Sequence, residues 1–166
     1  MKTGILAIIM ATIIMTGCSA SLSTAKKENN AAEYAKTAAL IESGNYQFAV
    51  RSATPSGGKT VQLTSSYTLE ARDGTYEAYL PYYGRAYSAS YGGGDGAVEF
   101  SGEPEDLKIT RNDDKNKISV AFTMKNDKDQ NKVTLNIGAS GFGNLVITSQ
   151  KRQTISYYGL TSALKD

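Results

Sequence analysis

The sequence predicts a mainly β domain, an antiparallel β-sandwich or barrel-like meander, preceded by one N-terminal helix. Three observations support this fold class: apolar and polar residues alternate over many short segments from residue 46 onward, turn-forming residues separate these segments, and the connections are short. Such a pattern is typical of antiparallel sandwiches and barrels. It leaves the choice between them open, because barrel closure depends on strand tilt and shear.

The first eighteen residues have the three parts of a secretory signal. Lys2 provides a basic start, an apolar run follows from Ile5 to Met15, and a small-residue site ends at Cys18. The apolar run is shorter than the about 20 residues that a membrane-spanning helix needs. We therefore expect residues 1–17 to be a signal peptide. The segment resembles a bacterial lipoprotein signal, which implies that Cys18, the single cysteine of the chain, carries the lipid that holds the protein at the membrane.

Residues 18–30 are expected to form the lipidated cysteine and a flexible tether. The segment is small and polar, so it cannot bury enough apolar surface to fold by itself. No aspartate follows Cys18 closely. By resemblance to other lipoproteins, this favours the periplasmic face of the outer membrane over retention in the inner membrane. The lack of an acidic cluster weakens the case for display on the cell surface.

A helix is expected to open the single β-rich domain, which we assign to residues 31–166. Asn30 can cap it, Glu33 supplies the partner of a capping box, and Gly44 offers a left-handed stop. One side of this helix is apolar in a narrow stripe, made of Tyr34, Ala38 and Ile41.

The pair Asp73-Gly74 gives the clearest hairpin signal. A two-residue loop there pairs Ala71 with Tyr76, and it also sets Glu70 opposite Glu77. This unfavourable pair leaves a bulged three-residue loop as an alternative. Strands are also expected over residues 46–50, 61–63, 97–101, 105–111, 117–124, 132–138, 144–149 and 154–158.

The composition argues against several classes of function. The chain has no histidine and one cysteine, so we expect no multi-cysteine metal site, no cofactor and no catalytic site. A net charge of +2 without a basic stripe argues against nucleic-acid binding. Weak matches to other sites are better explained as turns and loops: a glycine-rich phosphate loop over residues 92–96, half a calcium loop over residues 127–131, and acidic groups at residues 103–106 and 113–114.

Seven of the eleven tyrosines lie between Tyr67 and Tyr91, most of them in the segment YLPYYGRAYSASYGGGDG that begins at Tyr79. Tyrosine suits binding surfaces and half-buried packing sites equally well, and an arginine can stack on such rings. The simpler interpretation is that the rings plug the end of the sheet and place their hydroxyls on loop backbone. The candidate binding residues are Tyr79, Tyr82, Tyr83, Arg85, Tyr87, Tyr91, Arg152 and Tyr157.

Two segments resemble a known family. AYLPYYGRAYSASYGG over residues 78–93 and KRQTISYYG over residues 151–159 are similar to motifs of small Bacteroidota lipoproteins grouped as the domain of unknown function 4251. The resemblance extends over residues 46–159 and implies a single β-rich domain in the envelope of a diderm bacterium. The family carries no assigned activity, so the resemblance transfers no catalytic residue to this chain. If the two motifs meet in space, Arg85 and Arg152 would lie beside one aromatic patch.

Two functions remain in competition. The first is a non-enzymatic, lipid-anchored envelope protein that binds another envelope component or supports an assembly. The alternative is a periplasmic protein that binds a small ligand or a glycan in a tyrosine-rich groove, a kind of site that is concave with a few placed polar groups.

Overall fold

The computed structural model describes residues 20–85, 87, 96–125 and 129–164, with side chains from residue 27 onward. The predicted signal peptide and Cys18 lie outside these residues. Tyr91, most of the glycine-rich segment and Asp127 of the half calcium loop also lie outside the described residues.

Nine strands form one sheet in which each strand pairs antiparallel with its neighbours. The order across the sheet is β4-β3-β2-β1-β9-β8-β7-β6-β5, so the first and last strands of the chain pair at its centre. The strands are β1 (Tyr46–Pro55), β2 (Val61–Arg72), β3 (Thr75–Pro81), β4 (Ala97–Gly102), β5 (Glu105–Asn112), β6 (Lys117–Lys125), β7 (Gln130–Gly138), β8 (Phe142–Ser149) and β9 (Ile155–Ala163).

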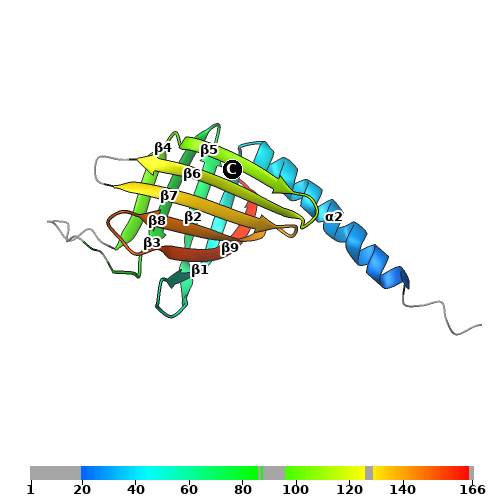
Figure 1. Cartoon of the computed structure of the whole chain (residues 1–166), viewed down its shortest axis with the longest axis horizontal. Coiled ribbons are helices and arrows are strands. Elements are labelled where there is room, and N and C mark those ends of the chain that lie inside the picture. Colours follow the sequence, from blue (N-terminus) through cyan, green and yellow to red (C-terminus); the bar gives the residue numbers. More distant parts are fainter. Residues whose placement is uncertain (1–19, 86, 88–95, 126–128, 165–166) are drawn as a thin grey trace, which may run out of the picture.

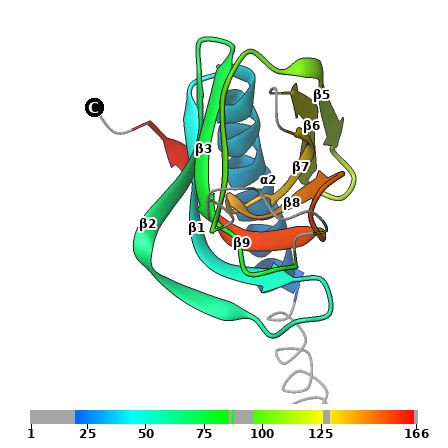
Figure 2. The same ribbon diagram turned by 90° about the vertical axis from the view of Figure 1, so that its left-hand side faces the viewer.

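The sheet curls on itself into a half-barrel. Strands β1–β4 run across strands β5–β9 in Figure 1, and Figure 2 shows the curl from one end. The edge strands β4 and β5 are not paired with each other, although Glu103 and Pro104 alone connect them. The predicted mainly β, antiparallel fold with one N-terminal helix is confirmed. The sheet neither closes into a barrel nor splits into two sheets.

A bulge in β1 accompanies this curvature. The register of β1 shifts between Val50 and Ser52 against both of its neighbours, β2 and β9. A bulged residue bends its strand and increases the local twist. Arg51, at the bulge, lies 4.9 Å from the centroid of the Phe142 ring.

Aromatic rings fill the space between the two layers of the half-barrel, strands β1–β4 and strands β5–β9. The Tyr76 ring of β3 and the Phe122 ring of β6 have centroids 4.4 Å apart, and Phe100 of β4 meets Phe122 edge-on at 6.4 Å. The hydroxyls of Tyr46 and Tyr76 lie 3.2 Å apart and form a hydrogen bond with each other in the core. Strands from opposite layers therefore contribute to one continuous core.

The helix α2 (Ala20–Glu42) covers one end of the half-barrel with its C-terminal part. Tyr34, Ala38 and Ile41 are buried there as the apolar stripe predicts. The Thr37 hydroxyl donates to the carbonyl oxygen of Ala139, in the turn between β7 and β8, at 2.8 Å. Gly44 has a φ of 71°, the left-handed conformation expected of a helix stop.

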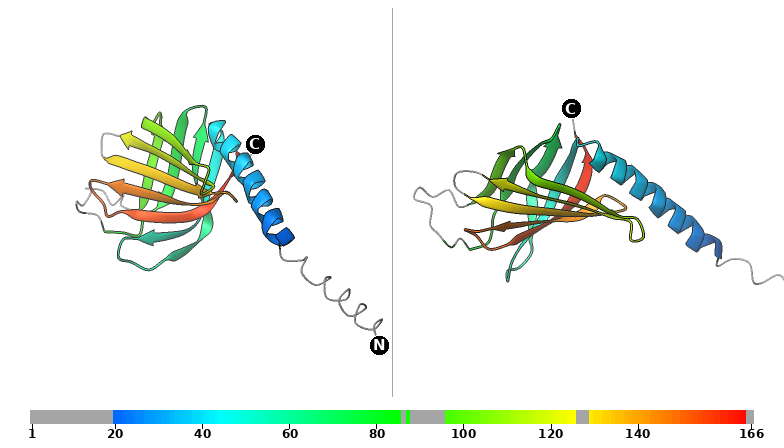
Figure 3. Two further views of the ribbon diagram at one scale, coloured as in Figure 1. Left: turned by 45° about the vertical axis from the view of Figure 1, so that its right-hand side comes forward. Right: turned by 45° about the horizontal axis from the view of Figure 1, so that its top comes forward.

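The helix begins at Ala20, so the prediction of a flexible coil over residues 18–30 is wrong for the segment from Ala20 to Asn30. Small polar residues prevent burial, but they do not prevent a helix from continuing once its C-terminal part is docked, because propagation costs little after nucleation. The N-terminal part extends away from the sheet (Figure 3). No helix in the described part of the chain is long and apolar enough to cross a membrane.

The hairpin at Asp73-Gly74 has the predicted register. Ala71 pairs with Tyr76 and Glu70 with Glu77, and the two loop residues have φ of 48° and 85°. These values belong to a two-residue type I′ loop. The bulged alternative is therefore wrong, and the two glutamates do face each other.

We expect Glu77→Lys to stabilise the domain by about 0.2–1 kcal/mol, because an opposite-charge pair then replaces two like charges. Urea unfolding measures the difference. The control Glu77→Gln removes the repulsion without adding attraction, so its gain should be smaller. A lysine variant no more stable than the glutamine variant would contradict this account.

Candidate functional site

The two tyrosine-rich motifs meet at the end of the half-barrel opposite α2. The backbone N–H of Gln153 donates to the carbonyl oxygen of Arg85 at 3.0 Å, and the N–H of Tyr87 donates to that of Lys151 at 2.7 Å. The N–H of Arg85 donates to the Gln153 side-chain oxygen at 3.3 Å. The chain after β3 thus runs beside the loop between β8 and β9, an arrangement that the sequence left open.

Two of the candidate tyrosines are buried, and their hydroxyls bond the backbone where the two motifs meet. Tyr82 is 8% exposed, and its hydroxyl lies 2.9 Å from the carbonyl oxygens of both Arg85 and Gln153. Tyr157 is fully buried and donates to the carbonyl oxygen of Pro81 at 3.0 Å. For these two residues the simpler interpretation is confirmed: the rings plug the end of the sheet and bond loop backbone.

Arg152 also stabilises the junction between the two motifs. Its guanidinium lies 5.3 Å from the centroid of the Tyr82 ring and donates to the carbonyl oxygen of Ala97, the first residue of β4. A buried ring and a strand end therefore both contact this guanidinium. Arg152 lies beside an aromatic ring, as expected if the two motifs meet, but the ring is that of the buried Tyr82, and no ring contact of Arg85 is found among the described residues.

The remaining described candidates point to solvent. Tyr79 is 60%, Tyr83 46% and Tyr87 69% exposed, and Arg85 is also exposed. Tyr79 lies within β3, while the other three follow it. We call Tyr83, Arg85 and Tyr87 the tyrosine rim.

A groove lies beside the rim, with a volume of about 430 Å³. It is lined by residues 55–58 from the β1–β2 hairpin, by residues 83–85 and by Gln153. Glycines allow its walls to pack closely: a Cβ on Gly84 would meet the Tyr82 hydroxyl at 2.4 Å, and one on Gly58 would meet Pro55 at 2.5 Å. The hairpin and Gln153 were not among the predicted site residues, although Gln153 lies in the second motif.

Buried tyrosines make the domain sensitive to high pH. Burial raises the pKa of Tyr46, as does the neighbouring Tyr76 hydroxyl, and burial also raises the pKa of Tyr157. Because the folded state favours the neutral form, their contribution is complete below the unfolded tyrosine pKa of about 10. It is lost as the pH rises above that value.

We therefore expect the free energy of unfolding to fall above about pH 10, by about 1.4 kcal/mol per pH unit for each such group. Urea unfolding at about pH 8 and about pH 11 measures the loss, which Tyr157→Phe should reduce. Equal losses in wild type and Tyr157→Phe would contradict the assignment.

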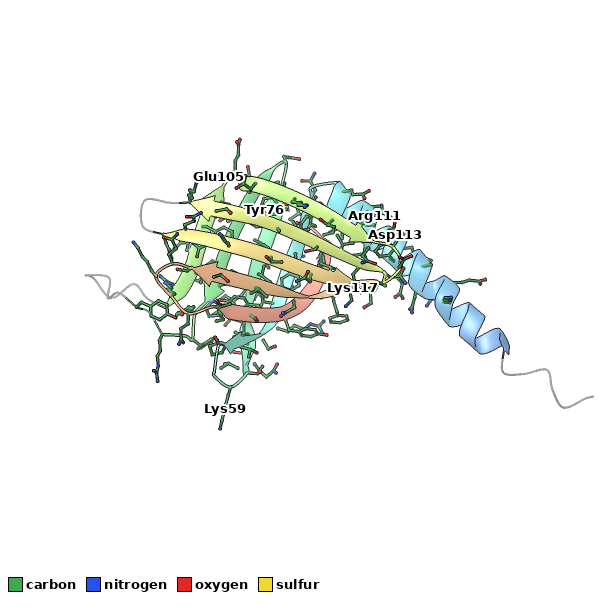
Figure 4. The ribbon with its side chains drawn as sticks, in the orientation of Figure 1. Lys59, Tyr76, Glu105, Arg111, Asp113 and Lys117 are labelled. Atoms are coloured by element: carbon green, nitrogen blue, oxygen red, sulfur yellow. The ribbon has the colours of Figure 1, made fainter. Side chains whose placement is uncertain are left out.

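Three acidic residues of the weaker motifs make structural contacts. Glu105 pairs with Lys125, and Asp129 accepts from the Gln130 N–H and the Ser149 hydroxyl. Asp113 accepts from the Tyr34 hydroxyl at 2.6 Å and pairs with Arg111 (Figure 4). These two partners hold the pKa of Asp113 below its usual value. Within the described ranges, no group of three or more acidic, cysteine or histidine residues is placed to hold a metal ion.

Fold and site together define a class of protein: a curled antiparallel half-barrel whose helix covers one end and whose tyrosine-rich motifs join at the other. The chain belongs to the family described as Domain of unknown function (DUF4251), which matches residues 28–161. The crystal structure of a DUF4251 family protein from Bacteroides eggerthii DSM 20697 has a similar fold, with a TM-score of 0.59 and 15% identity over 80% of this chain and 89% of that chain. No curated protein matches the chain.

Proposed function

We propose that this protein is a non-enzymatic, lipid-anchored module of the bacterial cell envelope that binds another envelope component through the tyrosine rim. In this proposal residues 1–17 are removed as a signal peptide, Cys18 carries lipid at the periplasmic face of the outer membrane, and α2 is the spacer between lipid and sheet. The bacterium would be a member of the Bacteroidota, as the sequence resemblance implies.

One observation carries the binding proposal. Two family motifs that lie far apart in the sequence are joined by backbone hydrogen bonds, and Tyr83, Arg85 and Tyr87 are exposed at this junction. Tyrosine and arginine are enriched among the residues that contribute most to protein interfaces, because they offer large contact areas and several hydrogen bonds. A turn that served only to close the sheet would have no need for exposed rings.

The position of the rim fits an anchored module. The α2 side chains contact the turn before β8, and the rim lies near the turn after β8. An eight-residue strand spans about 26 Å, so the rim and the docked part of the helix are separated by the length of the domain. With lipid attached upstream of α2, the rim would face away from the membrane.

Affinity capture from detergent-solubilised envelopes tests the binding proposal. We expect wild type and the control Tyr79→Ser to retain the same envelope component, and the double variant Tyr83→Ser/Arg85→Gln to lose most of it. Tyr79 is a suitable control because it is an exposed tyrosine outside the rim. Repeated capture of nothing specific, or equal capture by all three proteins, would reject the proposal.

Anchoring is tested separately. Full-length protein expressed with radiolabelled palmitate should carry the label and partition with membranes, whereas Cys18→Ser should do neither. The several acyl chains expected on such a cysteine hold a protein far longer than one chain does, since each buried methylene contributes about 0.8 kcal/mol. Label or stable membrane association that survives in Cys18→Ser would contradict the lipid anchor.

The groove supports a second candidate function, the binding of a small ligand or a glycan. Its volume of about 430 Å³ lies within the range of sites for small molecules. The half-exposed Tyr83 ring offers apolar surface, and Gln153 and Arg85 offer polar groups. The chain has no tryptophan, the side chain best suited to stacking, which favours a ligand held mainly by polar groups.

A further inference from the structure

We propose that the groove binds a saccharide that carries a carboxylate, with the carboxylate on the guanidinium of Arg85 and the sugar ring against Tyr83. This inference rests on the second candidate function and specifies its ligand class. It follows from the charge of the groove, from the way Arg85 is held, and from the remaining groups of the lining.

Among the described residues that line the groove, one is positively charged and none is negatively charged. Arg85 is the only charged residue among those that line it, because the others are proline, serine, glycines, tyrosine and glutamine. Within the described part of the chain, the Arg85 guanidinium has no hydrogen bond, ion pair or ring contact. Arg111 and Arg152, by contrast, are engaged with Glu42 and with the Ala97 carbonyl oxygen.

The backbone of Arg85 is fixed, although its side chain contacts no partner among the described residues. Its N–H donates to the Gln153 side chain, and its carbonyl oxygen accepts from the Gln153 N–H and from the Tyr82 hydroxyl. The Tyr82 ring in turn makes a cation–π contact with the guanidinium of Arg152. Part of the entropy cost of placing the guanidinium is therefore met by folding, and preorganisation of this kind favours binding.

A guanidinium presents two parallel N–H groups that match the two oxygens of a carboxylate. Among the described lining residues, the single positive charge of Arg85 balances the single charge of a carboxylate, whereas a phosphate monoester carries close to two charges. We therefore prefer a carboxylate, and treat phosphate binding as an outcome that the experiment distinguishes.

The rest of the lining suits a sugar ring. The side chain of Gln153 accepts from Arg85 through its oxygen, while its amide N–H groups donate to no atom of the described residues. The Ser56 hydroxyl and these N–H groups can bond sugar hydroxyls. The Tyr83 ring, 46% exposed, can cover the apolar face of the same sugar.

The test is a nitrogen-15 NMR titration of a soluble protein starting near Lys26, which keeps the docked part of α2. The probes are glucuronate, galacturonate and N-acetylmuramate, each compared with glucose, galactose or N-acetylglucosamine as its neutral counterpart, and with glucose 6-phosphate. We expect saturable shifts at Gly57, Arg85 and Gln153 from at least one acidic sugar, and none from its neutral counterpart.

Three variants make the test specific for the arginine. We expect Arg85→Gln to weaken binding about 10- to 100-fold, as for the loss of a hydrogen-bonded charged group, and Arg85→Lys to weaken it less. Lys59→Gln is the matched control, because it removes a charge from the same hairpin outside the groove lining, where Lys59 points away from the domain (Figure 4). It should bind as wild type does.

Equal shifts from acidic and neutral sugars, a preference for glucose 6-phosphate, or no saturable shift with any acidic sugar would each overturn the inference. Unchanged affinity in Arg85→Gln would do the same. The proposal of a rim that binds an envelope component is tested apart, because affinity capture that depends on Tyr83 and Arg85 can succeed even if every sugar fails.

Discussion

Gly159→Val is expected to lower the free energy of unfolding by about 3 kcal/mol, the upper part of the range for overpacked cores. A Cβ at this position would lie 2.3 Å from the carbonyl oxygen of Ala49 and 2.9 Å from the Phe48 ring. Both belong to β1, and the pairing of β1 with β9 joins the two halves of the sheet. The backbone of β1 cannot move away without breaking this central ladder.

Urea unfolding followed by circular dichroism measures this loss. The matched control is Gly96→Ala, because a Cβ on Gly96 meets nothing within 4 Å. We expect the control to remain close to wild type. A Gly159→Val variant within about 1 kcal/mol of wild type would mean that the central strands are not packed as described.

Tyr82→Ala is expected to have the second large effect, a loss of about 3 kcal/mol together with loosening of the rim. The substitution removes a nearly buried ring, the stacking surface of Arg152, and the hydroxyl that holds the carbonyl oxygens of Arg85 and Gln153. Tyr82→Phe keeps the ring and should cost about 1 kcal/mol, the net value of one hydrogen bond.

Amide hydrogen exchange shows whether the loss is local. The N–H groups of Tyr87 and Gln153, which join the two motifs, should exchange faster in Tyr82→Ala than in wild type. Amides of β6 and β7 should remain protected from exchange, to the extent set by the free energy of unfolding of the variant. If the amides of Tyr87 and Gln153 stayed as protected as those of β6, Tyr82 would not be the support of the rim.

Local sequence patterns predicted most of the strands but not how they join. The register at Asp73-Gly74 and the stop at Gly44 follow from backbone chemistry within a few residues. The last strand was expected to end at Tyr158, yet β9 continues to Ala163. Glycine weakens the interior of a strand, so the strand was expected to stop before Gly159, but this glycine is required by the close approach of β1, more than 100 residues away in the sequence.

The same limit applies to the candidate site. Tyr82 and Tyr83 are adjacent and chemically identical, but the first packs under the rim and the second is exposed. Tyr157 and Tyr158 differ in the same way, because neighbouring residues of a strand face opposite sides of the sheet. The sequence predicts that such residues gather in two motifs. It cannot predict that a third segment, the β1–β2 hairpin, completes the groove.

Site-specific photo-crosslinking tests most directly the central claim that the rim is the binding surface. A photoreactive phenylalanine analogue is placed at Tyr83 or Tyr87 and, as controls, at Leu107 of the edge strand or Lys115 near α2, all of them exposed. In envelope preparations we predict one discrete crosslinked species from each rim position and none from the two controls. Crosslinks from Leu107 or Lys115 with none from Tyr83 and Tyr87 would place the interaction elsewhere and contradict the account.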